Sequence, residues 1–311
     1  MSLVTGLATL IISLIMIIIS QKFFLKKKFI DVINKRSSHA SIATRSGGIA
    51  IFSTLFLIST YNYLLGNTVF DYSILLPIGL MVVVGLYDDI YNVDFKLKFI
   101  FQIIAAKMII DNGLIIDNFH GIFGIFEINR ILAQIITIFI IVAIINAINF
   151  IDGIDGLAIS IVSMFLILFE FMALDQTPFN NFTIILLISF IPLFYFNFRN
   201  NKKIFLGDSG SLFLGCLVSI YVLYALSNNY IIKPEYDINK VIFILTILPY
   251  PVIDIIRVFF KRIVAKKSPF IADKNHIHHK LLEIFSSHFL VVIVIFSSSI
   301  IFLTVTQVIL K

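Results

Sequence analysis

Long apolar segments separated by short polar ones run along nearly the whole chain. Windows of roughly 17–25 mostly apolar residues are long enough to cross the hydrocarbon core of a bilayer as α-helices. Ten such windows can be drawn, at residues 3–20, 48–65, 72–87, 97–115, 131–148, 157–174, 182–198, 206–226, 241–258 and 289–310. The window at 97–115 is the weakest, because it contains Gln102 and Lys107. The pattern predicts an all-α, polytopic integral membrane protein with about ten transmembrane helices.

Composition agrees with this prediction, since 59% of the 311 residues are hydrophobic and only 14% are charged. A soluble core of this length would not need so much apolar surface. The windows leave no soluble domain over, so we expect residues 1–311 to form a single polytopic membrane domain. The one cysteine, Cys216, falls within a window, which excludes a disulfide framework and a thiolate metal site.

Basic residues predict the orientation. No positive charge precedes the first window, whereas Lys22, Lys26, Lys27 and Lys28 follow it, so we interpret it as a retained anchor with the N-terminus outside and not as a cleaved signal peptide. Alternation from there assigns residues 21–47, 88–96, 149–156, 199–205 and 259–288 to the cytoplasm. Each of the 24 lysines and arginines can be assigned to its nearest helix end. Nineteen then lie on the inside, Lys107 stays within a helix, and only four lie outside: Arg130, Lys233, Lys240 and Lys311.

Four polar stretches stand at predicted cytoplasmic helix ends: "LYDDIYNVDFKLKFIFQ" (86–102), "NAINFIDGIDGLA" (146–158), "FLGDSGSLFLG" (205–215) and "KNHIHHKLL" (274–282). Ionisable residues in or beside membrane spans are costly and usually line a cavity or pathway. We therefore expect one site on the cytoplasmic face. A transporter more often has its site near the bilayer midplane, but a nucleotide-sugar or lipid-linked-sugar transporter stays the alternative, as does a non-catalytic lipid-binding scaffold.

Adjacent carboxylates end the third window. On a continuing helix, Asp88 and Asp89 would diverge by about 100°, so both could face one site only at a frayed helix end. The competing interpretation is solvated interfacial charge followed by a turn.

Polar residues recur at every third position of the second stretch, at Asn146, Asn149, Asp152 and Asp155. The glycines at 153 and 156 then permit a helix break. Carboxylate and amide oxygens suit a hard cation such as Mg²⁺, which takes its remaining ligands from water and phosphates. Simple helix capping is the alternative.

The last two stretches suit phosphates. "GDSGS" (207–211) opens a helix, where backbone amides bind anions, although capping alone also explains it. "HIHH" (276–279), flanked by Lys274 and Lys280, offers imidazoles and ammoniums to phosphate oxygens. A zinc site is one alternative for these histidines, but it lacks a fourth ligand nearby. The other alternative is a basic segment that contacts anionic lipid.

These stretches, together with "RSSHASIATRSGGIAIF" (36–52), resemble in content and order the polyprenyl-phosphate N-acetylhexosamine-1-phosphate transferases, the glycosyltransferase family 4 enzymes related to phospho-N-acetylmuramoyl-pentapeptide transferase. The resemblance implies transfer of N-acetylhexosamine 1-phosphate from a UDP-sugar to undecaprenyl phosphate, with release of UMP. It also implies a multi-pass protein of the bacterial inner membrane that initiates a lipid-linked O-antigen, capsule or teichoic-acid type glycan. Nucleic acid is not an expected partner, and a homodimer is one candidate assembly.

Site roles follow from the same resemblance. Asn149 and Asp208 would hold Mg²⁺, for which Mn²⁺ can substitute. Asp88, Asp89 and Asp208 would be catalytic. Phe205 would stack on uracil, and Asp152 and Asp155 would shape the nucleotide site. Asn146 would also contact substrate. Four further residues would contact phosphates: Lys98, His276, His278 and His279.

Two questions stay open at this point. The first is the role of Asp88, the family's usual base. A phosphate monoester has a second pKa near 6 and is largely ionised at neutral pH, so Asp88 could instead position Lys98 or the waters of the metal. A covalent route is a third option.

The second is the identity of the sugar, because the chain has Ala43–Gly48 where relatives carry "TPRGGG", and Lys280 where they carry arginine. We expect N-acetylglucosamine as the sugar, with N-acetylgalactosamine, N-acetylfucosamine and N-acetylquinovosamine as alternatives.

Overall fold

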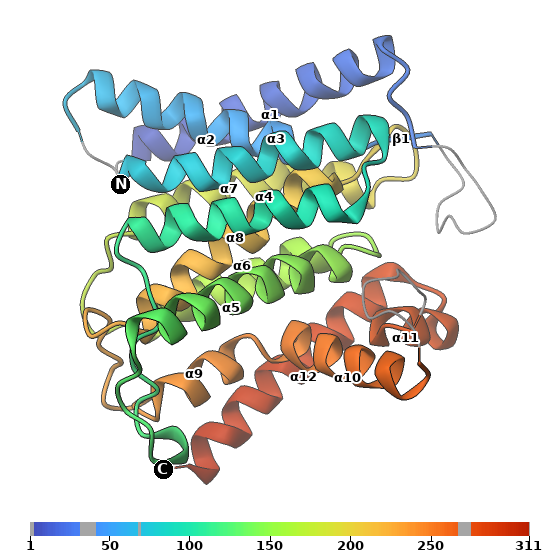
Figure 1. Cartoon of the computed structure of the whole chain (residues 1–311). Coiled ribbons are helices and arrows are strands. Elements are labelled where there is room, and N and C mark those ends of the chain that lie inside the picture. The colour runs from blue at the N-terminus through green and yellow to red at the C-terminus, as the bar shows by residue number, and fades with distance from the viewer. Residues whose placement is uncertain (1–2, 32–41, 68–69, 267–274, 311) are drawn as a thin grey trace. The chain divides into compact units, whose positions relative to one another are not determined.

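The computed structural model describes residues 3–31, 42–67, 70–266 and 275–310 (Figure 1). Residues 36–41 of the "RSSHASIATRSGGIAIF" stretch, and Lys274, lie outside the described residues. The elements are, in chain order, α1 (Leu3–Lys26), β1 (Ala43–Thr44), α2 (Gly47–Leu64), η1 (Tyr72–Ile74), α3 (Leu75–Tyr91), α4 (Phe95–Asp111), η2 (Ile122–Gly124), α5 (Arg130–Ile151), α6 (Leu157–Met172), α7 (Asn180–Phe198), β2 (Lys203–Ile204), α8 (Gly207–Leu226), α9 (Lys240–Ile247), α10 (Pro249–Val264), α11 (Ile277–Phe285) and α12 (His288–Ile309).

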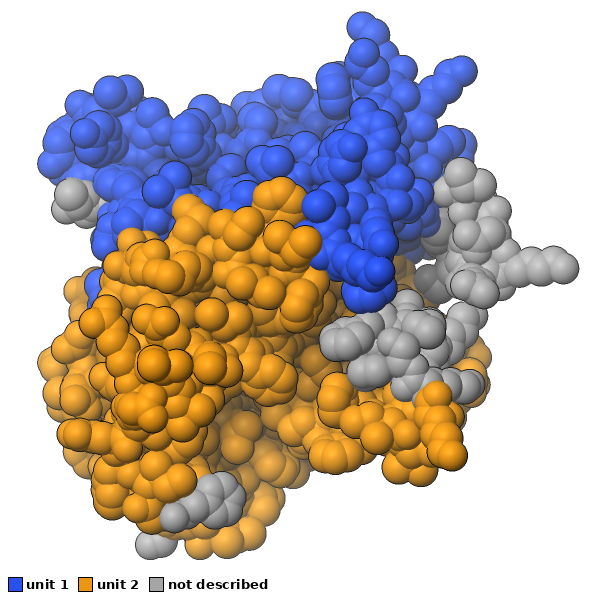
Figure 2. All heavy atoms as spheres, in the orientation of Figure 1, with its two compact units in different colours: residues 1–98, 178–213 blue, residues 99–177, 214–311 orange. Residues whose placement is uncertain are grey.

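The chain divides into two compact units, shown in blue and orange in Figure 2. The first contains residues 1–98 and 178–213, and the second contains residues 99–177 and 214–311. The division falls within α4 and within α8. The predicted single domain over residues 1–311 stays a prediction.

In the first unit, α1 packs against α2 and α7, and α2 packs against α3 and α7. Small polar residues occur where helices meet: the buried Ser13 hydroxyl of α1 donates to the carbonyl oxygen of Ser189 on α7 (2.8 Å). At the other end of α1, the Gln21 amide donates to the carbonyl oxygen of Lys202, just before β2 (2.6 Å). Backbone and side-chain groups therefore satisfy each other inside an apolar helix bundle.

A short parallel strand pair joins the starts of two helices in the first unit. β1 pairs with β2, with Ala43 opposite Lys203 and Thr44 opposite Ile204. The pairing continues beyond the strands, since the amides of Gly47 and Gly48 donate to the carbonyl oxygens of Phe205 and Leu206 (2.9 and 2.8 Å). The prediction of an all-α fold holds apart from this pair, which fixes the register between the beginnings of α2 and α8.

In the second unit, α12 packs against α6, α9, α10 and α11, and α10 packs against α5. Aromatic residues fill part of its core. The Tyr230 hydroxyl donates to the carbonyl oxygen of Phe169 (2.7 Å), and the two rings stack with centroids 4.7 Å apart. The buried hydroxyl is thereby satisfied without leaving the apolar interior.

Each of the ten predicted windows contains a helix or a helix pair. Seven helices in the described residues are long and apolar enough to cross a membrane, or eight if a bent pair counts as one span. α4 and the shorter α6 fall below that length, so the number of crossings stays a prediction. The single helix expected over 241–258 is wrong: α9 and α10 meet at an angle of 90°. Pro249 and Pro251 begin α10, and proline lacks the amide that a continuous helix would need there.

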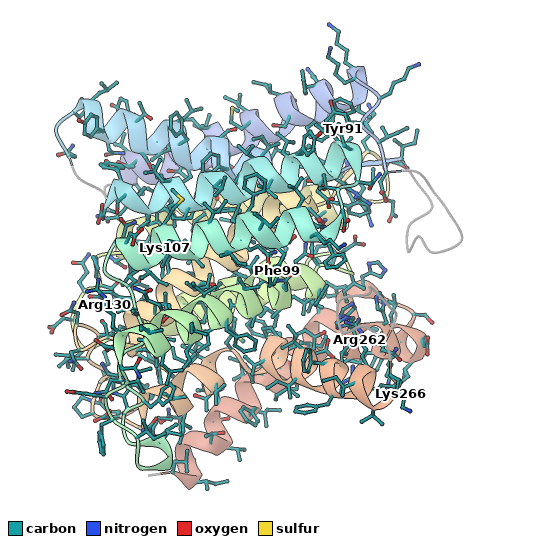
Figure 3. The ribbon with its side chains drawn as sticks, viewed as in Figure 1. Tyr91, Phe99, Lys107, Arg130, Arg262 and Lys266 are labelled. Atoms are coloured by element: carbon teal, nitrogen blue, oxygen red, sulfur yellow. The ribbon has the colours of Figure 1, made fainter. Side chains whose placement is uncertain are left out.

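Outer helix surfaces are apolar. Only 22% of the α1 span and 28% of the α12 span are buried inside the protein, and α1 exposes Leu3, Ile11 and Phe23. Figure 3 shows apolar side chains along the helices, with the labelled Arg130 and Lys266 at helix ends. Lipid is the solvent that suits such surfaces, so the chain is a multi-pass membrane protein.

Candidate active site

Asp88 lies near the end of α3 and is buried. Its Oδ1 accepts a hydrogen bond from the amide of Val93 (2.7 Å), and its Oδ2 accepts one from the ammonium of Lys98 (3.0 Å). Asn92, in a left-handed conformation (φ 53°), ends the helix between them. Asp88 therefore closes the turn from α3 to α4 and at the same time faces a cation.

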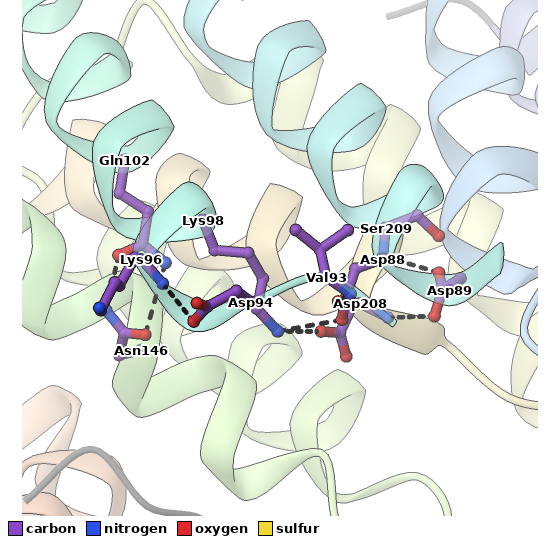
Figure 4. A network of polar contacts seen from close by, with 10 residues as sticks. All are labelled: Asp88, Asp89, Val93, Asp94, Lys96, Lys98, Gln102, Asn146, Asp208 and Ser209. Atoms are coloured by element: carbon purple, nitrogen blue, oxygen red, sulfur yellow. Dashed lines mark hydrogen bonds and ion pairs between the residues drawn. The ribbon is translucent and has the colours of Figure 1, made fainter. Parts of the chain in front are cut away.

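Lys98 joins two carboxylates (Figure 4). Its Nζ lies 3.0 Å from Asp88 Oδ2 and 3.0 Å from Oδ2 of Asp208, in the first turn of α8. We call these three residues the carboxylate–lysine cluster. Two carboxylates around one ammonium leave a net negative charge, so the cluster can attract a second cation, and the ammonium can in turn attract a phosphate.

Asp89 has different partners (Figure 4). Its two carboxylate oxygens accept hydrogen bonds from the amides of Asp208 and Ser209, both at 2.9 Å. Such first-turn amides have no partner within their own helix, and a negative charge beside them stabilises the helix. α3 continues to Tyr91, so the helix end is not frayed at these residues, and the two neighbouring side chains have different partners. Asp89 contacts backbone amides of α8, whereas Asp88 contacts it through side chains, among them Lys98.

Glycines permit these close contacts within the first unit. A Cβ atom added to Gly48 would lie 2.1 Å from the Gly210 nitrogen, and one added to Gly85 would lie 2.3 Å from the Asp208 carbonyl oxygen. Gly207 has a φ of 75°, which disfavours other residues. A Cβ at Gly210 would meet the Leu206 side chain at 2.2 Å and the Gly48 Cα of α2 at 3.0 Å.

Arg45 adds a second positive charge to the first unit. Its Nη2 lies 2.7 Å from Asp31 Oδ1. Although burial opposes the effect, the carboxylates of Asp31, Asp89 and Asp208 raise the pKa of Arg45. The sequence analysis gave Arg45 no role, and its position inside the "RSSHASIATRSGGIAIF" stretch was the signal that could have identified it.

Phe205, predicted to stack on uracil, lies between β2 and α8. Its backbone carries the strand register from β1 to α2, because its amide donates to Thr44 and its carbonyl accepts from Gly47. The Lys203 ammonium lies 5.8 Å from the centre of its ring. A base stacked on this ring stays a prediction.

Asn146, in the second unit, is engaged with another amide. Its Nδ2 donates to Gln102 Oε1 and to the carbonyl oxygen of Val142, both at 2.8 Å, and Gln102 donates back at 3.4 Å (Figure 4). Gln102 is buried. This pairing explains how the weakest predicted window tolerates a glutamine. It does not favour the predicted contact between Asn146 and substrate.

The "NAINFIDGIDGLA" stretch breaks where its glycines predict. α5 ends at Ile151, Gly156 has a left-handed backbone (φ 73°), and α6 begins at the next residue. Asp155 lies in this turn, and its Oδ2 is 2.7 Å from Nδ1 of His288, at the start of α12. The turn also contains Asp152 and follows Asn149, so the three predicted oxygen donors do lie at a helix end.

The three histidines of "HIHH" lie next to one another in the second unit. Adjacent ring centroids are 5.5 Å apart for His276 and His278, and 4.2 Å apart for His278 and His279. His278 is fully buried, and its Nδ1 shares a hydrogen bond with the Tyr250 hydroxyl (2.9 Å). Burial, reinforced by the neighbouring His279 and His276, lowers the pKa of His278 to about 3. His278 is therefore neutral at pH 7 and cannot act as a cation toward phosphate.

Gly153 is required beside that ring. A Cβ at Gly153 would lie 2.6 Å from His278 Nε2, a buried nitrogen that has no hydrogen-bond partner among the described residues. His276 makes a different contact: its Nδ1 lies 2.7 Å from Oδ2 of Asp254, which is buried on α10. The histidines thus lie between α10 and the turn after α5.

The predicted site residues therefore fall into two groups. Asp88, Asp89, Lys98 and Asp208 come together in the first unit, and the histidines contact the α5–α6 turn in the second. The shared binding of Mg²⁺ by Asn149 and Asp208 stays a prediction, because these residues belong to different units.

The oxygen donors fit a magnesium ion. Among the described residues, no three His, Cys, Asp or Glu side chains are arranged to hold a metal by themselves. Mg²⁺ does not need such a cage, since it keeps waters and uses one or two carboxylates together with substrate phosphates. The Asp208 carboxylate beside Asp88, facing a cation, has the right chemistry for that mode of binding.

Sequence reasoning missed several polar residues of the second unit: Tyr250, Asp254, Arg257 and His288. The first three stand four and three positions apart, as residues on one helix face do. An acidic and a basic residue within the apolar window at 241–258 were the signal that could have identified them.

Comparison with known proteins gives a consistent result. Residues 72–226 match the family model for glycosyl transferase family 4. A probable undecaprenyl-phosphate N-acetylglucosaminyl 1-phosphate transferase of Bacillus subtilis is 31% identical over 99% of this chain and 84% of its own length. An undecaprenyl-phosphate alpha-N-acetylglucosaminyl 1-phosphate transferase of Salmonella typhi is 28% identical over 91% of this chain and 78% of its own. A decaprenyl-phosphate N-acetylglucosaminephosphotransferase of Mycobacterium leprae is 32% identical over 35% of this chain and 28% of its own.

Proposed function

Because the chain belongs to glycosyl transferase family 4, we propose that it transfers N-acetylglucosamine 1-phosphate from its UDP-sugar to undecaprenyl phosphate. The observation that carries the proposal is the similarity to the Bacillus subtilis transferase over 99% of the chain. The product is a diphosphate-linked lipid that starts a cell-surface glycan of the O-antigen, capsule or teichoic-acid type, and the other product is UMP. The relatives named above are all transferases, which favours this function over the transporter alternative.

In the proposed reaction, an oxygen of the lipid phosphate attacks the phosphorus that carries the sugar. The new P–O bond replaces the bond from that phosphorus to the oxygen that bridges to UMP, and UMP leaves with the electron pair. One phosphoanhydride is exchanged for another, so the step is close to isoergic. Catalysis then depends on position and charge neutralisation.

The carboxylate–lysine cluster is suited to that task. Lys98 can place its ammonium on a phosphate oxygen while Asp88 and Asp208 hold it on two sides at 3.0 Å. Asp208 and Asn149 would hold Mg²⁺ on the donor diphosphate. A bound Mg²⁺ ion neutralises phosphate charge and aligns the reacting oxygens. Asp89 holds Asp208 in position, because its carboxylate accepts hydrogen bonds from two amides in the first turn of α8.

Asp88 fits a positioning role better than a base. One oxygen is held by the Val93 amide and the other by Lys98. The acceptor phosphate, with a second pKa near 6, is already largely ionised at neutral pH. A base would gain little there, whereas the negative charge of Asp88 keeps Lys98 in place.

The donor-side roles are proposals for the second unit. Asp152 and Asp155 lie in the turn after α5, which suits contacts with a nucleotide, and His276 and His279 suit its phosphates. His278 would contribute as a neutral ring that supports its neighbours. Phe205 remains the proposed platform for uracil.

We further propose that the protein lies in the bacterial inner membrane with this site on the cytoplasmic face. The excess of lysine and arginine in the segments between helices on that side supports the orientation.

An assay of purified protein tests the function. The protein, incubated with UDP-N-acetylglucosamine, undecaprenyl phosphate and Mg²⁺, should release UMP and form a lipid-linked sugar diphosphate. Folded protein that released no UMP from any UDP-N-acetylhexosamine would contradict the proposal and favour transport or scaffolding.

The same assay tests the metal assignment. We expect Asp208→Asn to lower turnover about a hundredfold, the usual order for loss of one charge-stabilising group at a reaction centre. Asp94→Asn is the matched control, because Asp94 is exposed and its Oδ1 caps the start of α4 at the Lys96 amide (3.1 Å). Excess Mg²⁺ or Mn²⁺ should rescue Asn149→Ala better than Asp208→Asn, because water replaces a neutral ligand more easily. Wild-type turnover of folded Asp208→Asn at limiting Mg²⁺ would reduce Asp208 to a helix cap.

A further inference from the structure

One face of α10 holds the segment that carries the histidines. Tyr250, Asp254, Arg257 and Lys261 stand at intervals of four, three and four residues, so their side chains project from the same side of the helix. All four contact residues 275–278. We call these four residues of α10 the histidine clamp.

Asp254 makes three contacts in the clamp. Its Oδ2 lies 2.7 Å from His276 Nδ1, and its Oδ1 accepts hydrogen bonds from the Ile277 amide (3.0 Å) and from Arg257 (2.7 Å). Its side chain is 1% exposed, so these groups replace the water that a carboxylate otherwise requires. Arg257 also donates to the carbonyl oxygen of Asn275, which fixes the backbone on the other side of His276.

The contacts determine which nitrogen of His276 is available. A carboxylate only accepts hydrogen bonds, so the contact with Asp254 requires a hydrogen on Nδ1. Nε2 is the nitrogen left for a ligand. When Nε2 also carries a proton and donates to a phosphate, the ring charge lies between two anions and is stabilised by both.

We propose that Asp254 is a positioning residue that acts through His276, fixing its ring and its Nδ1 hydrogen so that Nε2 can bind a phosphate of the nucleotide-sugar donor. The inference rests on the proposed function for the identity of the ligand. Phe150, at the end of α5, also packs against His276, with ring centroids 5.6 Å apart. The ring is thus held by the clamp and by an aromatic neighbour before any donor arrives.

Asp254→Asn is the sharpest variant, because it keeps the shape of the side chain. Its Oδ1 must still accept from Ile277 and Arg257, so its NH₂ group faces His276. A donor there requires Nδ1 to lose its hydrogen, and the ring becomes the neutral Nε2–H tautomer. We expect the KM for the UDP-sugar to rise about tenfold with kcat little changed, because the Nε2–H bond to a donor phosphate, made in both ground and transition states, loses its charge assistance. Glu283→Gln, which removes an exposed carboxylate from α11, should leave both constants unchanged.

A double-mutant cycle separates positioning from folding. If Asp254 acts through His276, Asp254→Asn should add little to the KM of a His276→Gln variant. Two outcomes would overturn the proposal. One is a double variant whose rise in KM is the product of the rises in the two single variants, and the other is an Asp254→Asn variant in which kcat and melting temperature both fall while KM is unchanged.

A spectroscopic measurement on the wild-type protein covers the case in which Asp254→Asn does not fold. Nitrogen NMR of ¹⁵N-histidine-labelled protein, with the His276 signal assigned through His276→Gln, should show a hydrogen on Nδ1. An Nε2–H tautomer without it would refute the role of Asp254. If the wild-type protein released no UMP, the proposed function would fail, while this measurement would still decide whether Asp254 controls His276.

Discussion

Neighbouring carboxylates in α3 have different partners, which separates the effects of replacing them. Both oxygens of Asp89 are held by backbone amides of α8, so its loss should loosen a helix end. Asp88 shares Lys98 with Asp208, so its loss should disturb the charge balance of the carboxylate–lysine cluster.

For Asp88, the test is the dependence of the lost activity on pH. We expect Asp88→Asn to lower kcat by about a hundredfold at every pH between about 7 and 9, because a monoester with a pKa near 6 is already ionised there. UMP release measured across this range, with melting curves to show that the variant is folded, checks the expectation. Recovery toward wild-type turnover at pH 9 would instead identify Asp88 as a general base.

His278 should make the protein sensitive to acid. Its pKa of about 3 in the folded state lies below the roughly 6.5 of an unfolded histidine, so the unfolded chain binds the proton more readily. Its contribution to stability is complete above pH 6.5 and is lost as pH falls toward 3, by about 1.4 kcal/mol at pH 5.5.

A neutral side chain in place of His278 removes this pH-dependent contribution to stability. His278→Gln should therefore show a smaller drop in melting temperature between pH 7.5 and pH 5.5 than the wild-type protein. The comparison is of the two drops, because the substitution itself lowers stability at both pH values. Equal drops would mean that His278 can take up a proton without unfolding.

Single residues were predictable where they stood in polar stretches at one predicted membrane face. Asp88, Lys98 and Asp208 are of this kind, and the structure brings them together. Asp254 and His288 were not, because each stands beside apolar sequence and its partner lies more than twenty positions away along the chain. Asn146 was assigned to substrate on a family resemblance, whereas its amide is bound to Gln102, a pairing that depends on how two helices pack.

At the scale of helices, apolar length predicted a helix in each of the ten windows, but neither the short α11 nor the break between α9 and α10. The window at 241–258 is apolar on both sides of the bend, which only Pro249 and Pro251 mark. A proline ends one helix or merely kinks it depending on tertiary context. The β1–β2 pair was also missed, since two-residue strands leave no periodic pattern.

Helix contacts through glycine give a prediction at this scale. We expect Gly48→Ala to lower the melting temperature, because its Cβ would lie 2.1 Å from the Gly210 nitrogen and backbone must move. Overpacking of this kind costs about 1–3 kcal/mol. Gly79→Ala in α3 is the control, since the nearest atom to its Cβ is 3.4 Å away on the Phe52 side chain, and alanine favours a helix. A melting temperature unchanged in Gly48→Ala would contradict the close approach of α2 and α8.

For the whole molecule, sequence predicted a membrane protein and an orientation, and the structure adds two compact units. Hydrophobicity identifies spans because a bilayer demands apolar surface over a fixed length. It carries no information on how the polar stretches of distant helices divide between units, which depends on side-chain packing. Basic residues predict the orientation independently of packing, through their expected bias toward the cytoplasmic side.

Cysteine labelling tests that orientation. In a Cys216→Ala background, cysteines introduced at Asn67, Gln176 and Asn228 should react with a membrane-impermeant thiol reagent applied to intact cells. Those at Asn34, Asn201 and Ser268 should react only after the membrane is permeabilised. Cys216 is buried, so its replacement removes little background. Asn201 is the decisive position, because it precedes β2, whose chain continues into the first turn of α8 and Asp208. Reaction of that cysteine from outside would place the carboxylate–lysine cluster on the outer face, away from UDP-sugars made in the cytoplasm, and would contradict the proposed site.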